Sequence, residues 1–389
     1  MLLPILLIGG AVFAAAVTAY GMDPELAQFN HGIQIITISR RLEWPLIIIS
    51  LALCVALLGL IITGRRRAWW AIGLGVVLAL FVRGLSSIYR PPITLLESPP
   101  MVEANKAQPF VAAQEYVVGF RMADKYFALP YHQLAAFPLV MLSDFDQRAL
   151  VIWSATANAA IVLPLDRDAS PRELEVVSTP ADSLLLFDRK LGQFIVGVTG
   201  RTVAGRRPIG MGDALPVEKM PFDHWANAHP DTRVMAVVAS SSLPMTPLLP
   251  RLHFPIESPD SAQRRVSLLA TTQPAAIPND ATFTGTRGIT VGKTVVLLMR
   301  ESAVAPLRAF DRQAADDLFL TFAPVRRPDK KRPTATLKDA ESGSFWTNQC
   351  KAIDGPLKGT QLREIPIRHD LYWGVMKFWM PDLQLIDVK

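Results

Sequence analysis

The chain has 389 residues, half of them hydrophobic, with 31 prolines, two cysteines and a formal net charge of +6. The basic residues at 326–332 form its sharpest charged cluster, but no aromatic residues are interleaved with them, so we expect a solvated loop and no nucleic-acid partner. Cys54 lies inside an apolar run and Cys350 lies far along the chain. This placement excludes a fold held together by disulfides.

The first ninety residues contain three apolar runs, at 1–22, 44–64 and 68–89, the last interrupted by Arg83. At about 1.5 Å per residue, a run of about twenty crosses a hydrocarbon core of about 30 Å. A cleaved signal peptide is the alternative for the first run, but no basic residue precedes it and it is longer than the usual signal core. We therefore predict a three-helix transmembrane region over 1–90, with the lipid bilayer as a partner.

The three arginines at 65–67 fill the short turn between the second and third runs. Positive clusters in short loops stay on the cytoplasmic side. This predicts a cytoplasmic amino terminus, with everything after Tyr89 outside the cytoplasm. The exceptions to the rule, which would lie on the outer side, are Arg40, Arg41, Arg83 and Arg90.

The remaining residues predict a mainly β (α+β) soluble region, because short apolar runs alternate with turn residues. Several prolines at 91–114 forbid a regular helix and predict an irregular linker. We then expect a β-rich half A at 115–238, a proline-rich connector at 239–283 with a strand at 264–270, and a β-rich half B at 284–389.

The two halves share a pattern at a spacing of 151 residues, which predicts a degenerate internal duplication. Asp188, Gly192 and Phe194 recur as Asp339, Gly343 and Phe345. Such a segment suits a turn, since the aspartate bonds its own backbone, the glycine takes a positive φ and the phenylalanine returns to the core. The segment DKYFAL at 124–129 also resembles GKTVVL at 292–297. A feature present in both halves is more typical of scaffold than of an active site.

Two further segments share the spacing, one with Trp225 and Pro230 and the other with Met376 and Pro381. Each predicts a short helix that is packed by its large residue and stopped before the proline. We assign these residues to packing.

Several segments together resemble the family named domain of unknown function 3179. They are VVGFRMADKYFALP at 117–130, LVIWSATANAA at 150–160, LLLFDRKLGQFIVGVTGRTVAG at 184–205 and FWTNQCKAIDGPLKGTQLREIP at 345–366. The resemblance covers most of 115–389. It implies an exported or membrane-tethered bacterial protein. Together with the three apolar runs and the arginine turn, it predicts a multi-pass protein of the inner (cytoplasmic) membrane with its soluble domain on the extracytoplasmic side.

The chain departs from this family at a segment resembling Thr-Tyr-Cys-Pro-x-Cys-Gly, which matches residues 152–158 here. Ser154 and Ala157 stand at the two cysteine positions. Two thiolates at that spacing are what a soft metal or a redox exchange requires, and serine and alanine supply neither. The family's His-Glu pair is also not recovered, because Phe137 and Pro138 fall near its place and His132 is an imperfect substitute.

The remaining candidates for chemistry are weak. His224, His229 and Asp231 combine imidazole and carboxylate, which can bind a metal. The five-residue spacing of the two histidines turns them apart on a helix, so capping and surface roles are favoured, and we predict no cofactor.

Cys350 is the other candidate. Lys351 beside it would lower the pKa of the thiol, and His369 with Asp370 would complete a nucleophilic set. Against this, Cys350 aligns with Thr199 in a predicted strand, where a small buried residue is common.

Two functional hypotheses follow. The first is a non-catalytic, membrane-anchored structural or interaction protein, which acts with a protein partner, as a homo-oligomer or as a subunit of a larger membrane complex. The second is an extracytoplasmic redox or metal-dependent enzyme with a site between the two halves. The lost cysteines and missing catalytic motifs favour the first.

Overall fold

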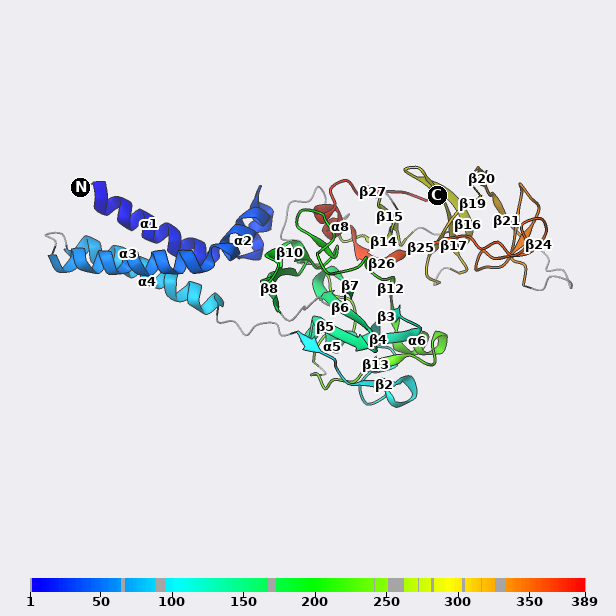
Figure 1. Ribbon diagram of the computed structural model, residues 1–389, viewed down its shortest axis with the longest axis horizontal. Coiled ribbons are helices and arrows are strands. Elements are labelled where there is room, and N and C mark those ends of the chain that lie inside the picture. Colours follow the sequence, from blue (N-terminus) through cyan, green and yellow to red (C-terminus); the bar gives the residue numbers. More distant parts are fainter. Residues whose placement is uncertain are drawn as a thin grey trace.

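The computed structural model describes residues 2–63, 67–88, 95–166, 173–240, 242–250, 262–271, 273–280, 283–302, 305–315, 317–325 and 334–388 (Figure 1). Several predicted features lie outside these residues. They are most of the arginine turn, Arg90 with the two prolines after it, and the basic cluster at 326–332.

Three long helices coincide with the three apolar runs, namely α1 (Leu2–Tyr20), α3 (Glu43–Thr63) and α4 (Arg67–Ile88). They pack together around Ala11, Ala15, Leu57 and Val77. Within the described residues, α3 is long and apolar enough to cross a membrane, whereas Ile5–Tyr20 and Trp70–Gly84 are shorter apolar helices. Figure 1 shows this bundle at one end of the molecule, with β16 to β24 at the other.

Two short helices that the apolar runs did not predict connect α1 to α3. They are η1 (Pro24–Gln28), whose amino terminus is capped by the Asp23 side chain, and α2 (Gly32–Arg41). Both lie at the end of the bundle that faces the β region (Figure 1).

The β region consists of two units, which we call unit A (95–237) and unit B (262–388). Unit A has three sheets, with strand orders β12-β3-β4-β13-β2, β1-β5-β6-β7 and β11-β10-β9-β8. Its elements are β1 (Leu96–Glu97), β2 (Met101–Glu103), η2 (Ala104–Lys106), β3 (Tyr116–Met122), β4 (Lys125–Pro130), α5 (Tyr131–Ala136), β5 (Leu139–Asp144), β6 (Gln147–Ser154), η3 (Ala155–Ala157), β7 (Ala159–Leu165), β8 (Leu174–Ser178), η5 (Pro180–Asp182), β9 (Leu185–Asp188), β10 (Gln193–Val196), β11 (Arg201–Thr202), β12 (Val217–Pro221), α6 (Phe222–Ala228) and β13 (Arg233–Met235).

Unit B has three four-stranded sheets, with orders β26-β14-β15-β27, β16-β17-β18-β25 and β21-β22-β23-β24, and a two-stranded sheet β19-β20. Its elements are β14 (Arg265–Leu269), β15 (Ala275–Pro278), β16 (Gly285–Val291), β17 (Thr294–Arg300), β18 (Arg308–Asp311), β19 (Gln313–Ala315), β20 (Leu318–Phe319), β21 (Phe322–Pro324), β22 (Leu337–Asp339), β23 (Phe345–Trp346), β24 (Ala352–Asp354), β25 (Glu364–Ile365), β26 (Ile367–Tyr372), α8 (Trp373–Trp379) and β27 (Gln384–Leu385).

The first sheet of each unit has the same strand order and the same strand directions. In unit A, β12, β3 and β4 are antiparallel neighbours and β13 joins β4 in parallel. In unit B, β26, β14 and β15 are antiparallel neighbours and β27 joins β15 in parallel. A short helix follows the edge strand in both units, α6 after β12 and α8 after β26.

This topology corrects the boundary and one sequence match. The predicted connector at 239–283 contains β14, the strand expected within it, and also β15, and these two occupy the place of β3 and β4. Residues 124–129 lie in the β3–β4 hairpin, whereas 292–297 lie in the β16–β17 hairpin of a different sheet. The match between those two segments is therefore wrong, because unrelated two-residue hairpins draw on the same turn residues.

The predicted irregular linker at 91–114 also forms part of unit A. In its described part, 95–114, β1 pairs with β5 and β2 pairs with β13, while Ala107 and Val111 are buried. Prolines exclude a helix, but they are compatible with short strands at a sheet edge.

One hydrophobic core joins the three parts of the molecule. It includes Ala27 of η1, Ile36 of α2, Phe194 of β10, Val266 of β14 and Met376 of α8. The β region is thus packed against the helices that connect the apolar runs.

Candidate functional site

The segment at 154–158 occupies the turn between β6 and β7. The Ser154 hydroxyl accepts a hydrogen bond from the Leu184 amide at 3.1 Å, and Ala157 is buried in the core shared by the three parts. Asn158 ends the turn at φ 46°, a left-handed conformation that asparagine tolerates well. The two positions that matched family cysteines are therefore occupied by a hydroxyl that caps backbone and by a core methyl group.

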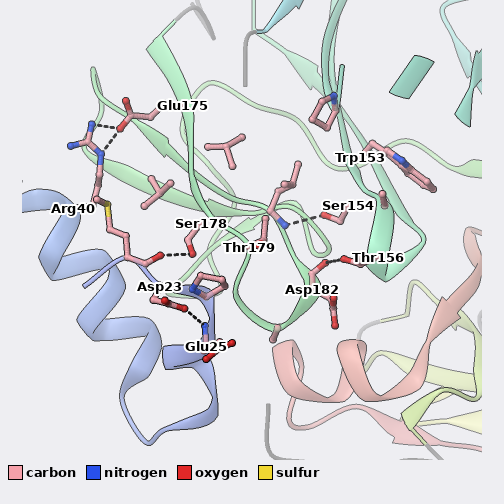
Figure 2. Close-up of a pocket in the computed structure, with 18 of the residues that line it drawn as sticks. Asp23, Glu25, Arg40, Trp153, Ser154, Thr156, Glu175, Ser178, Thr179 and Asp182 are labelled. Carbon is pink, nitrogen blue, oxygen red and sulfur yellow. Dashed lines mark hydrogen bonds and ion pairs between the residues drawn. The ribbon is translucent and has the colours of Figure 1, made fainter. Parts of the chain in front are cut away.

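A cavity of about 830 Å³ lies beside this segment, between unit A and the ends of the helices. Figure 2 shows Ser154 and Thr156 on one side of it, Asp23 and Glu25 of the η1 region opposite, and Asp182 on the same wall as Thr156. The other charged residues in the wall are Arg40, Glu43, Arg83, Glu175 and Arg189.

Ion pairs and hydrogen bonds fix the two walls of the cavity to each other. Arg40 bridges Glu43 of α3 and Glu175 of β8, and Glu175 also pairs with Arg189 at 2.7 Å. The Ser178 hydroxyl donates to the Met22 carbonyl at 2.8 Å. Figure 2 shows the contact between Arg40 of α2 and Glu175 of β8, and the contact that Ser178 makes next to Asp23.

A second polar cluster, which we call the inter-unit cluster, ties unit A to unit B. It consists of Tyr131, Asn158, Lys219, Arg265 and Asp370. The Asn158 amide donates to the Asp370 carbonyl at 2.7 Å and to its carboxylate at 2.8 Å, and its oxygen accepts from the Tyr131 hydroxyl at 2.8 Å. Arg265 pairs with the Asp370 carboxylate at 3.2 Å.

Lys219 is the buried cation of this cluster. It lies on β12, which runs beside β26, and its ammonium donates to the Asn158 carbonyl and, at 3.0 Å, to the Asp370 carbonyl. Burial lowers the pKa of Lys219 to about 7, although the Asp370 carboxylate opposes this shift. Asp370 itself has φ 56°, so the strand is locally strained where the two units meet.

Two neighbours on β26 are also removed from water. Burial lowers the pKa of His369 to about 4, and its Nδ1 lies 3.3 Å from the Ser267 hydroxyl. Arg368 donates to the Val198 carbonyl of unit A at 2.6 Å, and burial lowers its pKa to about 10. The 830 Å³ cavity is not lined by Lys219, His369 or Asp370, and neither is the small pocket beside Tyr131 and Pro244.

The structure does not bring His224, His229 and Asp231 together. His224 is exposed, whereas the His229 ring stacks on Tyr126 at 3.9 Å and contacts Trp225 at 4.2 Å. Burial lowers the pKa of His229. Within the described residues, no group of three His, Cys, Asp or Glu side chains is arranged to hold a metal ion.

His132, the imperfect substitute for the family's His-Glu pair, is buried against Glu115. Its Nδ1 contacts the Glu115 carboxylate, which also accepts from the His132 amide at 3.1 Å. The carboxylate further accepts from the Ala112 amide at 3.4 Å, so the pair fixes the start of α5.

The pKa of Cys350 is shifted in the opposite direction to the one that the sequence suggested. It is fully buried among apolar residues of the second and third sheets of unit B, and burial raises the pKa of its thiol to about 12. Lys351 is exposed and does not appear among the causes of this shift. His369 and Asp370 contact Ser267 and Arg265 in another sheet, so the hypothetical nucleophilic set is not assembled.

The inter-unit cluster was missed by sequence reasoning. Its members are spread along the chain from residue 131 to residue 370, so no short motif contains them. The one local signal is Lys219, a lone lysine in the apolar-flanked strand at 217–221.

The profile of the family described as "Protein of unknown function (DUF3179)" matches residues 91–383. The chain belongs to this family. The matched range covers nearly all of units A and B. No curated protein and no solved structure is significantly similar to the chain.

Proposed function

We propose that this DUF3179 protein is a multi-pass protein of the bacterial inner membrane. Its β region lies outside the cytoplasm and has a non-catalytic structural or interaction role, as a homo-oligomer or within a larger membrane complex. The observation that carries the proposal is the packing of the 21–42 connection against unit A at one end of an apolar bundle.

Three spans are supported by the surface of the bundle. Aliphatic and aromatic side chains point outward from all three long helices, with exposed fractions between 44 and 69%, at Ile5, Leu6, Phe13, Trp44, Ile48, Leu51, Val55, Ile62, Ile72, Val76 and Val82. Small residues bring the helices together, as where Gly84 meets Thr18, which is typical of membrane helices. At about 1.5 Å per residue, α1 and α4 reach about 28 and 33 Å.

The orientation is supported by the two ends of the bundle. The 21–42 connection and the β region are at one end, while α3 ends and α4 begins at the other, next to the 65–67 arginines. Within the described residues, three exceptions to the positive-inside rule have protein partners. Arg40 pairs with Glu43 and Glu175, Arg41 donates to Gly192, and the Arg83 guanidinium lies 5.1 Å from the Tyr20 ring centre.

A non-catalytic role is supported by the surroundings of the side chains that were candidates for chemistry. The Ser154 hydroxyl and the His132 ring are engaged with backbone or carboxylate neighbours, and the Cys350 thiol is protonated and buried. Thiol exchange and metal binding by cysteine both require an accessible thiolate.

The second candidate function, a redox or metal-dependent enzyme with a site between the halves, is favoured by one observation. Lys219 is a buried lysine with a lowered pKa between the two units, and such a shift is common at catalytic sites. Its hydrogen bonds to two carbonyls are those of a structural cation. Stoichiometric copper, zinc or iron in the purified protein, lost on substitution of residues between the units, would establish this alternative.

We also propose that units A and B derive from an internal duplication. The common strand order of their first sheets and the 151-residue spacing of Asp188 and Asp339 support it.

Thiol labelling tests the topology. Phe145 lies at a hairpin tip of unit A and is 94% exposed, whereas both native cysteines are buried. In spheroplasts, a Phe145→Cys variant should react with a membrane-impermeant maleimide as fast as it does after lysis, and the parent chain should remain unlabelled. Labelling that requires lysis would place unit A in the cytoplasm and refute the proposed orientation.

A further inference from the structure

Helix α2 has two chemically different faces. On one face Ile36 and Ser39 are buried, and Ile36 belongs to the core shared with units A and B. On the other face Ile35, Ile38 and Leu42 are 42, 54 and 46% exposed. Because these three residues have helical spacing, they form one apolar stripe.

The polar contacts of α2 with unit A come from arginines outside this stripe. The Arg41 guanidinium donates to the Gly192 carbonyl at 3.1 Å and lies 5.5 Å from the Phe194 ring centre. Arg40 pairs with Glu175 and lies 5.4 Å from the Phe187 ring centre. Unit A therefore occupies one side of α2 and leaves the stripe uncovered.

The stripe is continuous with the apolar surface of the bundle. Phe29 precedes α2 and is 60% exposed, and exposed apolar residues of α3 begin at Trp44, two residues after Leu42. A helix connecting two spans at the same end of a bundle is held at the level of the lipid headgroups. A helix with an apolar stripe and basic residues inserts that stripe into the boundary between headgroups and acyl chains.

We propose that α2 is an interfacial helix, with Phe29, Ile35, Ile38 and Leu42 embedded in the outer lipid surface and with Arg40 and Arg41 holding unit A on its other side. The partner is the lipid bilayer itself. Unit A is then clamped in one orientation on the membrane. This inference rests on the proposed membrane anchor and deepens it.

Site-directed spin labelling of the full chain in lipid nanodiscs tests the inference. Single cysteines are placed in a Cys54→Ala, Cys350→Ala background at Ile38, in the stripe, and at Gln34, an exposed polar position on the same helix. Collisions with oxygen, which concentrates in lipid, are compared with collisions with a water-soluble nickel chelate. We expect the oxygen effect to dominate for Ile38→Cys and the nickel effect to dominate for Gln34→Cys.

A third position separates this inference from the anchor on which it rests. Ile49 lies in α3 and is 48% exposed. An Ile38→Cys label in water with an Ile49→Cys label in lipid overturns the interfacial helix and keeps the span. An Ile49→Cys label in water refutes the anchor itself. An Ile38→Cys label shielded from both reagents overturns the inference in favour of a protein partner or a second copy covering the stripe.

Discussion

Units A and B carry the same aspartate turn, but the two turns have different neighbours. In unit A the turn's Gly192 carbonyl accepts from Arg41 of α2, and Phe194 lies beneath the same guanidinium. In unit B the corresponding Phe345 lies beneath Lys338 of its own sheet. The turn is therefore scaffold in both units, and in unit A it also contacts helix α2. Comparing the two turns distinguishes residues that maintain the fold of each unit from residues that attach unit A to α2.

The turns also differ in how completely the aspartate is used. Asp339 accepts from the amides of Ser342 and Gly343 and from the Trp346 indole at 2.8 Å. Asp188 accepts from the Leu191 amide at 3.1 Å and weakly from Gln193. We therefore expect the stability of unit B, which is farther from the bundle, to depend more on its turn than the stability of unit A does.

The largest expected effect concerns the packing residues of the paired helices. Trp225 of α6 and Met376 of α8 occupy equivalent places and are 2 and 1% exposed. We expect Trp225→Ala to cost about 3–5 kcal/mol and Met376→Ala about 2–5 kcal/mol of unfolding free energy, because each leaves a cavity. Urea unfolding of the purified chain in detergent, followed by near-UV circular dichroism, measures both.

Trp373 is the matched control for that experiment. It is half-buried at the start of α8, with Lys377 5.8 Å from its ring centre. Trp373→Ala should therefore cost less than Trp225→Ala. Equal costs would contradict the burial that distinguishes the two positions.

The next effect concerns the contact between the units. Because the pKa of Lys219 is lowered from 10.5 to about 7, the unfolded chain binds more protons between these values. Lys219 therefore makes the unfolding free energy rise as the pH increases from 7 to 10, by at most about 1.4 kcal/mol per pH unit. Lys219→Met should abolish most of this rise.

The same variant has a separate effect at pH 7. It removes the Lys219 donor from the Asn158 carbonyl and leaves the Asp370 carbonyl with the Asn158 side-chain amide as its donor, which should cost about 1–3 kcal/mol. Lys351→Met, at an exposed position, is the control. An unchanged pH slope in Lys219→Met would show that Lys219 is not the titrating group.

A smaller effect distinguishes the two turns. Asp339→Ala should cost about 1.5–3 kcal/mol, as for hydrogen bonds to a charged group, and Asp188→Ala about 0.5–1.5 kcal/mol. Burial would raise the pKa of Asp339, but bonds from Trp346 and Ser342 outweigh it and lower the pKa. Its contribution is thus present above the ordinary aspartate pKa near 4 and is lost as pH falls below it. Equal costs at pH 7, or no acid sensitivity, would contradict the difference.

The smallest effect is expected at the thiol. Cys350 aligns with Thr199 of unit A, and its raised pKa of about 12 keeps it protonated. Cys350→Ala should cost about 1 kcal/mol, a typical value for a single substitution, and should leave the cellular phenotype unchanged. Cys350→Ser is less suitable, since it buries a hydroxyl in an apolar cluster. Rapid maleimide labelling of the folded parent chain would contradict the buried, protonated thiol.

The sequence by itself determined the features that rest on local periodicity and turn chemistry. The apolar runs predicted α1, α3 and α4 within a few residues, and the Asp-x-x-x-Gly-x-Phe segments predicted both turns, with Gly192 and Gly343 at φ 62° and 72°. The large residue before each proline also predicted α6 and α8. Each of these signals depends on neighbours close along the chain, which a single sequence displays directly.

The tertiary structure alone decided what depends on contacts between distant segments. The edge strands β1 and β2 form because β5 and β13 supply their partners, and β14 takes the place of β3 because β26 and β15 flank it. Burial raises the pKa of Cys350, where the sequence suggested that Lys351 would lower it. Asn158, Lys219 and Asp370 meet because β12 lies beside β26, and their joint burial, rather than any residue pattern, gives them their chemistry.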